Sequence, residues 1–74
     1  MTGMTYTNLI NTTLELYLQK DYLKAYNFIT ENSIKVKGND AQIYNFRYSV
    51  ASKAGLNDLA MKIMKEAIVE KGYW

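Results

Sequence analysis

The second half of the chain has apolar residues three and four positions apart, interrupted by one short polar break. This spacing puts the apolar side chains of a helix on one face. One stripe comes before the break and another follows it: Ile43, Tyr44, Phe46, Val50, Ala51 and Ala54, then Leu59, Ala60, Ile63, Met64, Ala67 and Ile68. Residues 41–74 are therefore predicted to form two helices.

The break between the two stripes has the residues of a tight helix-to-helix turn. Gly55 can adopt the left-handed conformation that ends a helix. Asn57 can cap the next helix, and Asp58 favours the positive end of its dipole. Because the link is short, we expect the two helices to lie antiparallel.

The first half of the chain repeats this pattern weakly at an offset of 35 residues. Lys20 falls where the second half has Gly55. The other matched positions have similar hydrophobic character: Leu9 with Tyr44, Leu16 with Ala51, Ala25 with Ala60, Ile29 with Met64 and Ile34 with Val69. Thr5 or Thr7, Asp21, and Asn39 with Gln42 as a capping box are the expected helix starts. Gly38 and Gly72 are the expected ends. We predict a single all-α domain of residues 1–74, with four helices in two antiparallel helix–turn–helix hairpins at about 6–38 and 40–72.

The second hairpin resembles a tetratricopeptide repeat. Tyr44, Gly55, Ala60 and Ala67 match that family's spacing, and Met64 stands at its bulky apolar position. Tyr48 and Arg47 depart from it, as does the absence of proline. The resemblance extends from about Tyr6 to Gly72 and implies two degenerate units stacked as a short solenoid.

The composition removes the usual catalytic and metal-binding side chains. The chain has no histidine and no cysteine, so it lacks the common general base, thiol nucleophile and zinc ligands. Glu66 and Glu70 are the only carboxylates at helical spacing on one face, and we expect them to be solvated among neighbouring lysines. We therefore predict no enzymatic activity, no metal and no cofactor.

The charge pattern argues against nucleic-acid and membrane partners. The net charge is +2, and the lysines are spread over all four predicted helices. Arg47 lies beside Phe46 and Tyr48, which could stack on a base, so a small basic nucleic-acid binder is the third hypothesis. No apolar run approaches the roughly 20 residues that span a bilayer, and the N-terminus lacks signal-peptide features. The expected location is cytoplasmic.

The tetratricopeptide resemblance implies a peptide-binding surface on the first helix of each pair. The first unit would give it an apolar half and the second a polar half with one cation. The residues are Ile10, Leu14 and Tyr17, followed by Gln42, Asn45, Ser49, Ser52 and Lys53. Most of the family's carboxylate-binding residues are missing, so capture of a C-terminal carboxylate is not expected. In the alternative, Ile10, Leu14 and Tyr17 are core residues and nothing binds.

Two hairpins are fewer than the roughly three repeats that usually make a stable stack. The last helix is apolar rather than a polar cap, so Ile68, Tyr73 and Trp74 are candidates for self-association. Residues 66–74 also resemble the junction after an N-terminal helical repeat in bacterial multidomain enzymes, including α/β-hydrolases. Our first hypothesis is a protein-interaction or scaffolding module that binds a protein, a peptide or itself. The alternative is a non-catalytic N-terminal helical domain of a larger bacterial enzyme such as an α/β-hydrolase.

Overall fold

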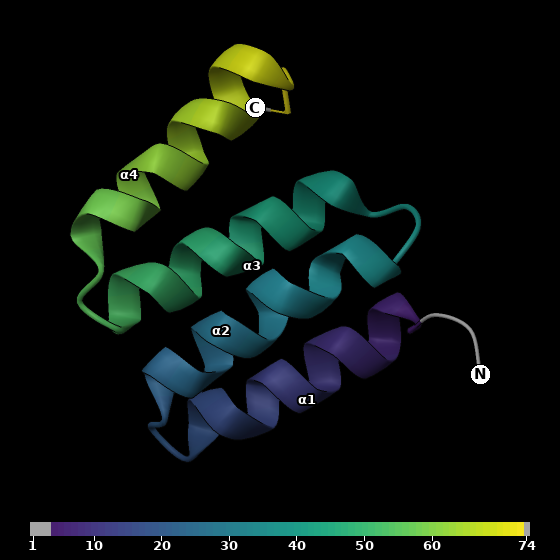
Figure 1. Ribbon diagram of the computed structural model, residues 1–74, viewed down its shortest axis with the longest axis vertical. Coiled ribbons are helices and arrows are strands. Elements are labelled where there is room, and N and C mark those ends of the chain that lie inside the picture. The colour runs from purple at the N-terminus through teal and green to yellow at the C-terminus, as the bar shows by residue number, and fades with distance from the viewer. Residues whose placement is uncertain (1–3, 74) are drawn as a thin grey trace.

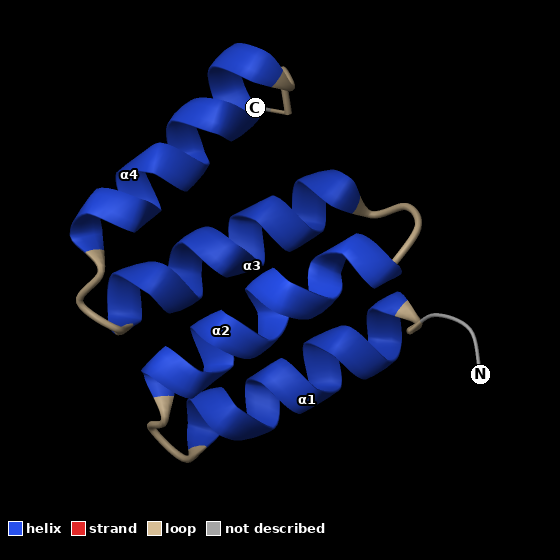
Figure 2. Ribbon diagram, viewed as in Figure 1, coloured by secondary structure: helices blue, strands red, loops and turns tan. Residues whose placement is uncertain are grey.

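The computed structural model describes residues 4–73, and the helices in it follow the predicted order (Figure 2). They are α1 (Tyr6–Leu18), α2 (Tyr22–Asn32), α3 (Asp40–Lys53) and α4 (Asn57–Lys65). A 3₁₀ turn, Ser33–Lys35, follows α2, and a π-helical turn, Glu66–Glu70, continues α4. The described residues contain no strand, so the prediction of an all-α fold with four helices is confirmed.

Each helix packs on the one that precedes it in the chain. In Figure 1, α1, α2 and α3 lie side by side and α4 leans away from α3 toward the C-terminal end. The described part measures 33 × 27 × 15 Å. An α-helix with its side chains is about 10–12 Å across, so the domain is a slab little more than one helix deep.

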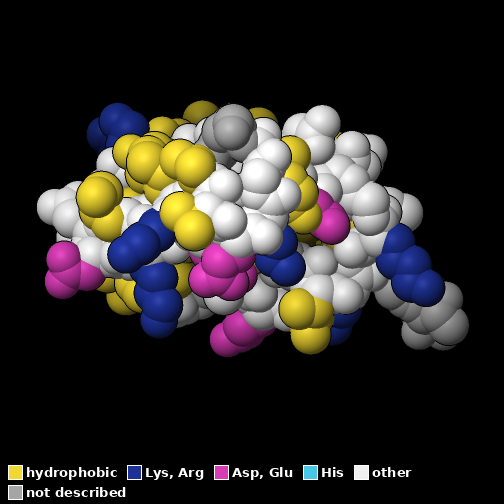
Figure 3. All heavy atoms as spheres, turned by 90° about the horizontal axis from the view of Figure 1, so that it is seen from above, with side chains coloured by type: hydrophobic (Ala, Val, Ile, Leu, Met, Phe, Trp, Pro, Cys, Tyr) yellow, Lys and Arg dark blue, Asp and Glu magenta, His cyan; other side chains and the backbone are white. Residues whose placement is uncertain are grey.

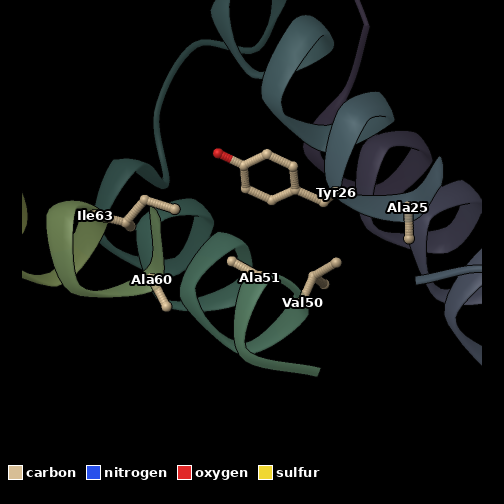
Figure 4. Packing of buried hydrophobic residues seen from close by; sticks show 6 residues of the cluster. All are labelled: Ala25, Tyr26, Val50, Ala51, Ala60 and Ile63. Carbon is tan, nitrogen blue, oxygen red and sulfur yellow. The ribbon is translucent and has the colours of Figure 1, made fainter. Parts of the chain in front are cut away.

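Two clusters of buried apolar residues hold the slab together. One joins α1, the end of α2, the loop that follows it and the start of α3, and consists of Leu9, Ile29, Val36 and Ile43. The other joins α2, α3 and α4 (Figure 4) and consists of Ala25, Tyr26, Val50, Ala51, Ala60 and Ile63. Alanines in the second cluster are at most 4% exposed, and their small side chains let the helix backbones approach closely.

The turn between α1 and α2 is a Schellman motif. The Asp21 N–H donates to the Leu16 carbonyl at 3.0 Å, and the Lys20 N–H donates to the Tyr17 carbonyl at 2.9 Å. Lys20 has a φ of 64°. This left-handed conformation is unfavourable for a residue that has a Cβ atom.

The turn between α3 and α4 has the same geometry 35 residues later. The Leu56 N–H donates to the Ala51 carbonyl at 2.9 Å, and the Gly55 N–H donates to the Ser52 carbonyl at 3.1 Å. Gly55 has a φ of 79°, as its sequence position predicted. The internal offset thus relates two turns of one type, with Lys20 in the place of glycine.

One predicted helix cap is confirmed and another is wrong. Thr5 caps α1, because its hydroxyl oxygen accepts a hydrogen bond from the Asn8 N–H at 3.1 Å. Asn39 precedes α3, but its φ is 59°. An N-cap side chain bonds the helix from an extended backbone, so Asn39 in the left-handed region forms no capping box with Gln42. Gly38, the residue before Asn39, also has a positive φ, of 89°.

The caps of α2 and α4 also differ from expectation. Asp21 precedes α2 as predicted, yet within residues 4–73 its side chain makes no cap hydrogen bond. Leu56, rather than Asn57, is the cap residue of α4. Leu56 is also the last residue of the Schellman motif that ends α3, so one residue serves both helices and Asn57 is already helical.

A substitution at Lys20 tests the strained turn. Lys20→Gly should raise the free energy of unfolding by about 0.5–1 kcal/mol. Glycine removes the cost of the left-handed conformation, which is roughly 1–2 kcal/mol for a residue with a Cβ atom. Part of this gain is lost because glycine has more conformational freedom in the unfolded chain. Urea denaturation at pH 7 measures the change. Lys24→Gly, an exposed position inside α2, is the matched control and should instead destabilise by about 1 kcal/mol. A destabilising Lys20→Gly would contradict this account.

Candidate functional site

A groove of about 290 Å³ lies between α1 and α3. Its lining combines side chains from both helices: Tyr6, Leu14, Tyr17, Gln42, Asn45, Phe46 and Ser49. The structure therefore brings together five residues that the sequence assigned to a partner-binding surface: Leu14, Tyr17, Gln42, Asn45 and Ser49. We call this the inner groove. Binding of a partner in it remains a prediction.

Three of the residues assigned to that surface do not line the inner groove. Ile10 is half-buried and packs against the core cluster that contains Leu9, as the alternative interpretation expected. Ser52 and Lys53 are exposed in the last turn of α3, beyond the end of the groove. Their spacing is correct for one helical face, but they do not contribute to the groove lining.

Two lining residues were not predicted. Phe46 follows Gln42 by four positions and precedes Ser49 by three, so helical spacing alone could have identified it. It was instead assigned to the core stripe and to possible base stacking beside Arg47, and it does contact both core clusters. Tyr6 begins α1, and a first helical residue gives little periodic signal.

The inner groove has aromatic walls and polar groups that carry no formal charge. Tyr6, Tyr17 and Phe46 supply apolar area, while the amides of Gln42 and Asn45 can donate and accept hydrogen bonds. Such a lining can hold one apolar side chain and bond an extended backbone beside it.

A second cluster joins the end of the described chain to α3, and we call it the C-terminal latch. The Tyr44 hydroxyl donates to Glu66 Oε2 at 2.8 Å. The Arg47 guanidinium lies 5.1 Å from the centre of the Tyr44 ring. The centres of the Tyr44 and Tyr73 rings are 5.4 Å apart. The Tyr73 hydroxyl donates to Asp40 Oδ2 at 3.3 Å. These contacts fold the segment after α4 back onto the start of α3.

The latch changes the acidity of both tyrosines. Burial raises the pKa of the Tyr44 hydroxyl, and the hydrogen bond to Glu66 raises it further. Loss of solvent also raises the pKa of Tyr73, with a further contribution from the negative charge of Asp40. Both hydroxyls are therefore neutral donors at pH 7.

The latch corrects one prediction and bears on another. Glu66 was expected to be solvated like Glu70, but it is half-buried and accepts the Tyr44 bond, whereas Glu70 is exposed. Tyr73, a candidate for self-association, packs on Tyr44 of its own chain, and self-association through it remains a prediction. Neither long-range contact leaves a periodic signal in the sequence. Trp74 lies outside the described residues.

A third surface covers the side of α4 that faces away from α3, and we call it the α4 outer face. A shallow groove of about 630 Å³ runs along it, lined by Asp58, Met61, Lys62, Met64, Lys65, Ile68 and Val69. Met61 is 65% exposed and Val69 71% exposed. Ile68, a candidate for self-association, lies here. Figure 3, which views the end of the molecule where α4 finishes, shows hydrophobic side chains gathered beside basic and acidic ones.

Two further kinds of feature are absent from residues 4–73. These residues contain no group of three or more carboxylate, histidine or cysteine side chains that could hold a metal ion. No helix among them is long and apolar enough to cross a membrane.

The fold and these surfaces define a small helical domain, and comparison with known families identifies it. A family model described as "A/B hydrolase-like, N-terminal domain" matches residues 5–74. The chain belongs to this family. The match does not support membership of the tetratricopeptide family, and it favours the alternative hypothesis, an N-terminal domain of a larger hydrolase-like protein.

A solved structure has the same fold. The chain is 55% identical to an uncharacterized protein from Bacillus cereus ATCC 10987, whose crystal structure at 2.75 Å resolution superposes with a TM-score of 0.90. The match covers 96% of this chain and 23% of that chain, so this chain spans about a quarter of the solved relative. A search of curated proteins found no match.

Because the pKa of Tyr44 is raised on folding, the free energy of unfolding should fall as the pH rises through the alkaline range. Folding favours the neutral tyrosine, so this stabilisation is complete below the unfolded-state pKa of about 10 and is lost as the pH rises through the higher folded-state pKa. We expect Tyr44→Phe to lower the free energy of unfolding by about 1 kcal/mol at pH 7, because Glu66 loses a donor in a partly exposed site. The same variant should show a smaller further loss between about pH 9 and about pH 11.

Urea denaturation across this pH range measures both effects. Tyr22→Phe is the control, because the Tyr22 ring packs on Tyr17, away from the latch. It should keep the wild-type pH profile. A Tyr44→Phe profile identical to that of the wild type would show that the Tyr44–Glu66 bond contributes nothing.

Proposed function

We propose that this domain is a non-catalytic helical module that packs on, and stabilises, the hydrolase-like domain of an α/β-hydrolase-like protein. The observation that carries the proposal is the family match over residues 5–74. The chain's lack of histidine and cysteine supports it, because hydrolases of this general type use a nucleophile activated by a histidine base. The catalytic groups would then belong to the remainder of the protein.

Exposed apolar side chains support a packing role. A slab of this depth keeps large side chains at its surface, including Leu18 at 71% and Val69 at 71% exposure. Such side chains contribute stability only when a neighbouring surface covers them, at roughly 25 cal/mol for each Å² buried. A contact with a second domain would therefore stabilise both partners.

A deletion experiment tests this function. The full-length protein and a version lacking residues 1–74 are compared by scanning calorimetry and by hydrolysis of p-nitrophenyl acetate. We expect the 74-residue chain alone to show no hydrolysis above the buffer rate. The deletion should lower the melting temperature of the hydrolase-like domain by several degrees, as loss of about 1–2 kcal/mol does in a domain of ordinary size. Hydrolysis by the isolated chain, or an unchanged melting temperature, would contradict the proposal.

A second candidate function is peptide binding in the inner groove, favoured by the five residues that converge there as expected. Peptides that bind this chain would first be selected from a random displayed library. Their affinity should fall at least tenfold for the Leu14→Glu variant, because the substitution places a charge in the inner groove. Leu23→Glu, on an exposed part of α2, should leave their affinity unchanged. If both variants bind alike, the groove is not the peptide site.

A further inference from the structure

The α4 helix has apolar residues on two sides. Ala60 and Ile63, with Ala67 just beyond the helix, are buried on the side toward α3. Met61, Ile68 and Val69 are exposed on the α4 outer face. A surface helix normally has a single apolar stripe that faces its own core. The second stripe on α4 therefore indicates a further packing partner.

The C-terminal latch fixes the end of the described chain against the start of α3. The Tyr73 N–H donates to the Ala67 carbonyl at 2.8 Å, and the Tyr73 side chain contacts Tyr44 and Asp40. Ile68 and Val69 lie in the π-helical turn just before this segment. Tyr73 is thus held by three contacts within the domain, a few residues after Ile68 and Val69 of the α4 outer face.

We propose that the α4 outer face is the docking surface for the hydrolase-like domain of the same protein. This inference rests on the proposed function and names the surface that performs it. The solved relative supports an occupant from the same chain, because most of that relative lies outside the 23% that matches this domain. The description of the matching family as an N-terminal domain of hydrolase-like proteins supports a hydrolase-like occupant. A partner surface that fits has apolar side chains at its centre, which methionines accommodate well, and carboxylates that face Lys62 and Lys65.

Cysteine labelling tests the proposal, because residues 1–74 contain no cysteine of their own. Single substitutions Met61→Cys and Val69→Cys are made in the full-length protein with the hydrolase-like domain present. Leu23→Cys on α2 and Leu14→Cys in the inner groove are the controls, since these leucines are 56% and 40% exposed. Maleimide labelling at each position is followed over time by peptide mass spectrometry. Circular dichroism checks that each variant retains its helices.

We expect Met61→Cys and Val69→Cys to react at least tenfold more slowly than Leu23→Cys, although both are more exposed within the domain. Equal rates at these positions would overturn the proposal. Slow labelling confined to Leu14→Cys would also overturn it, by assigning the contact to the inner groove. Slow labelling on α4 that becomes fast on dilution would identify a second copy of the protein as the occupant, and would refute the proposal.

The deletion experiment separates failure of this inference from failure of the proposed function. If removal of residues 1–74 destabilises the hydrolase-like domain while the α4 cysteines label rapidly, the packing function stands and the docking surface is elsewhere. If the deletion has no effect, the packing function itself is wrong.

Discussion

Close contact between helix backbones at alanine positions is the constraint on which this fold depends. Ala25, Ala51, Ala60 and Ala67 are almost fully buried, and the offset of 35 residues relates the first and third of them. A larger side chain at these crossings would separate the helices, and overpacking of this kind typically costs 1–3 kcal/mol. Larger apolar residues such as Val50 and Ile63 then fill the space beside each crossing.

The sequence predicted the parts of the fold that depend on local, periodic signals. The four helices, the Thr5 cap and the reversal at Gly55 follow from side-chain spacing and backbone preference, and the structure has all three. The predictions for Asn39 and Asn57 were wrong because neither residue has the extended backbone of a capping residue. Asn39 has a φ of 59°, and Asn57 is already part of α4. A sequence motif for a cap specifies the residue types, but it does not specify the φ angle of the capping residue.

The candidate sites divide in a similar way. The inner groove was largely predictable, because Gln42, Asn45 and Ser49 occupy one face of one helix and α1 lies alongside it. The latch was not predictable, because it joins Tyr44 to Glu66 and Asp40 to Tyr73 across 22 and 33 residues. Side-chain contacts over such separations depend on the packing angle between α3 and α4. No pattern within either helix encodes that angle.

The third helix, α3, takes part in the inner groove, both core clusters and the C-terminal latch. Its residues line the inner groove, fill the core and anchor the latch. Each side of α3 has a different neighbour, and a substitution that improves one contact is constrained by the others along the same helix. Across natural variants of this domain, α3 should therefore change most slowly in evolution. The exposed side of α2, where Leu23 and Lys24 lie, has fewer contacts to preserve and should drift more freely.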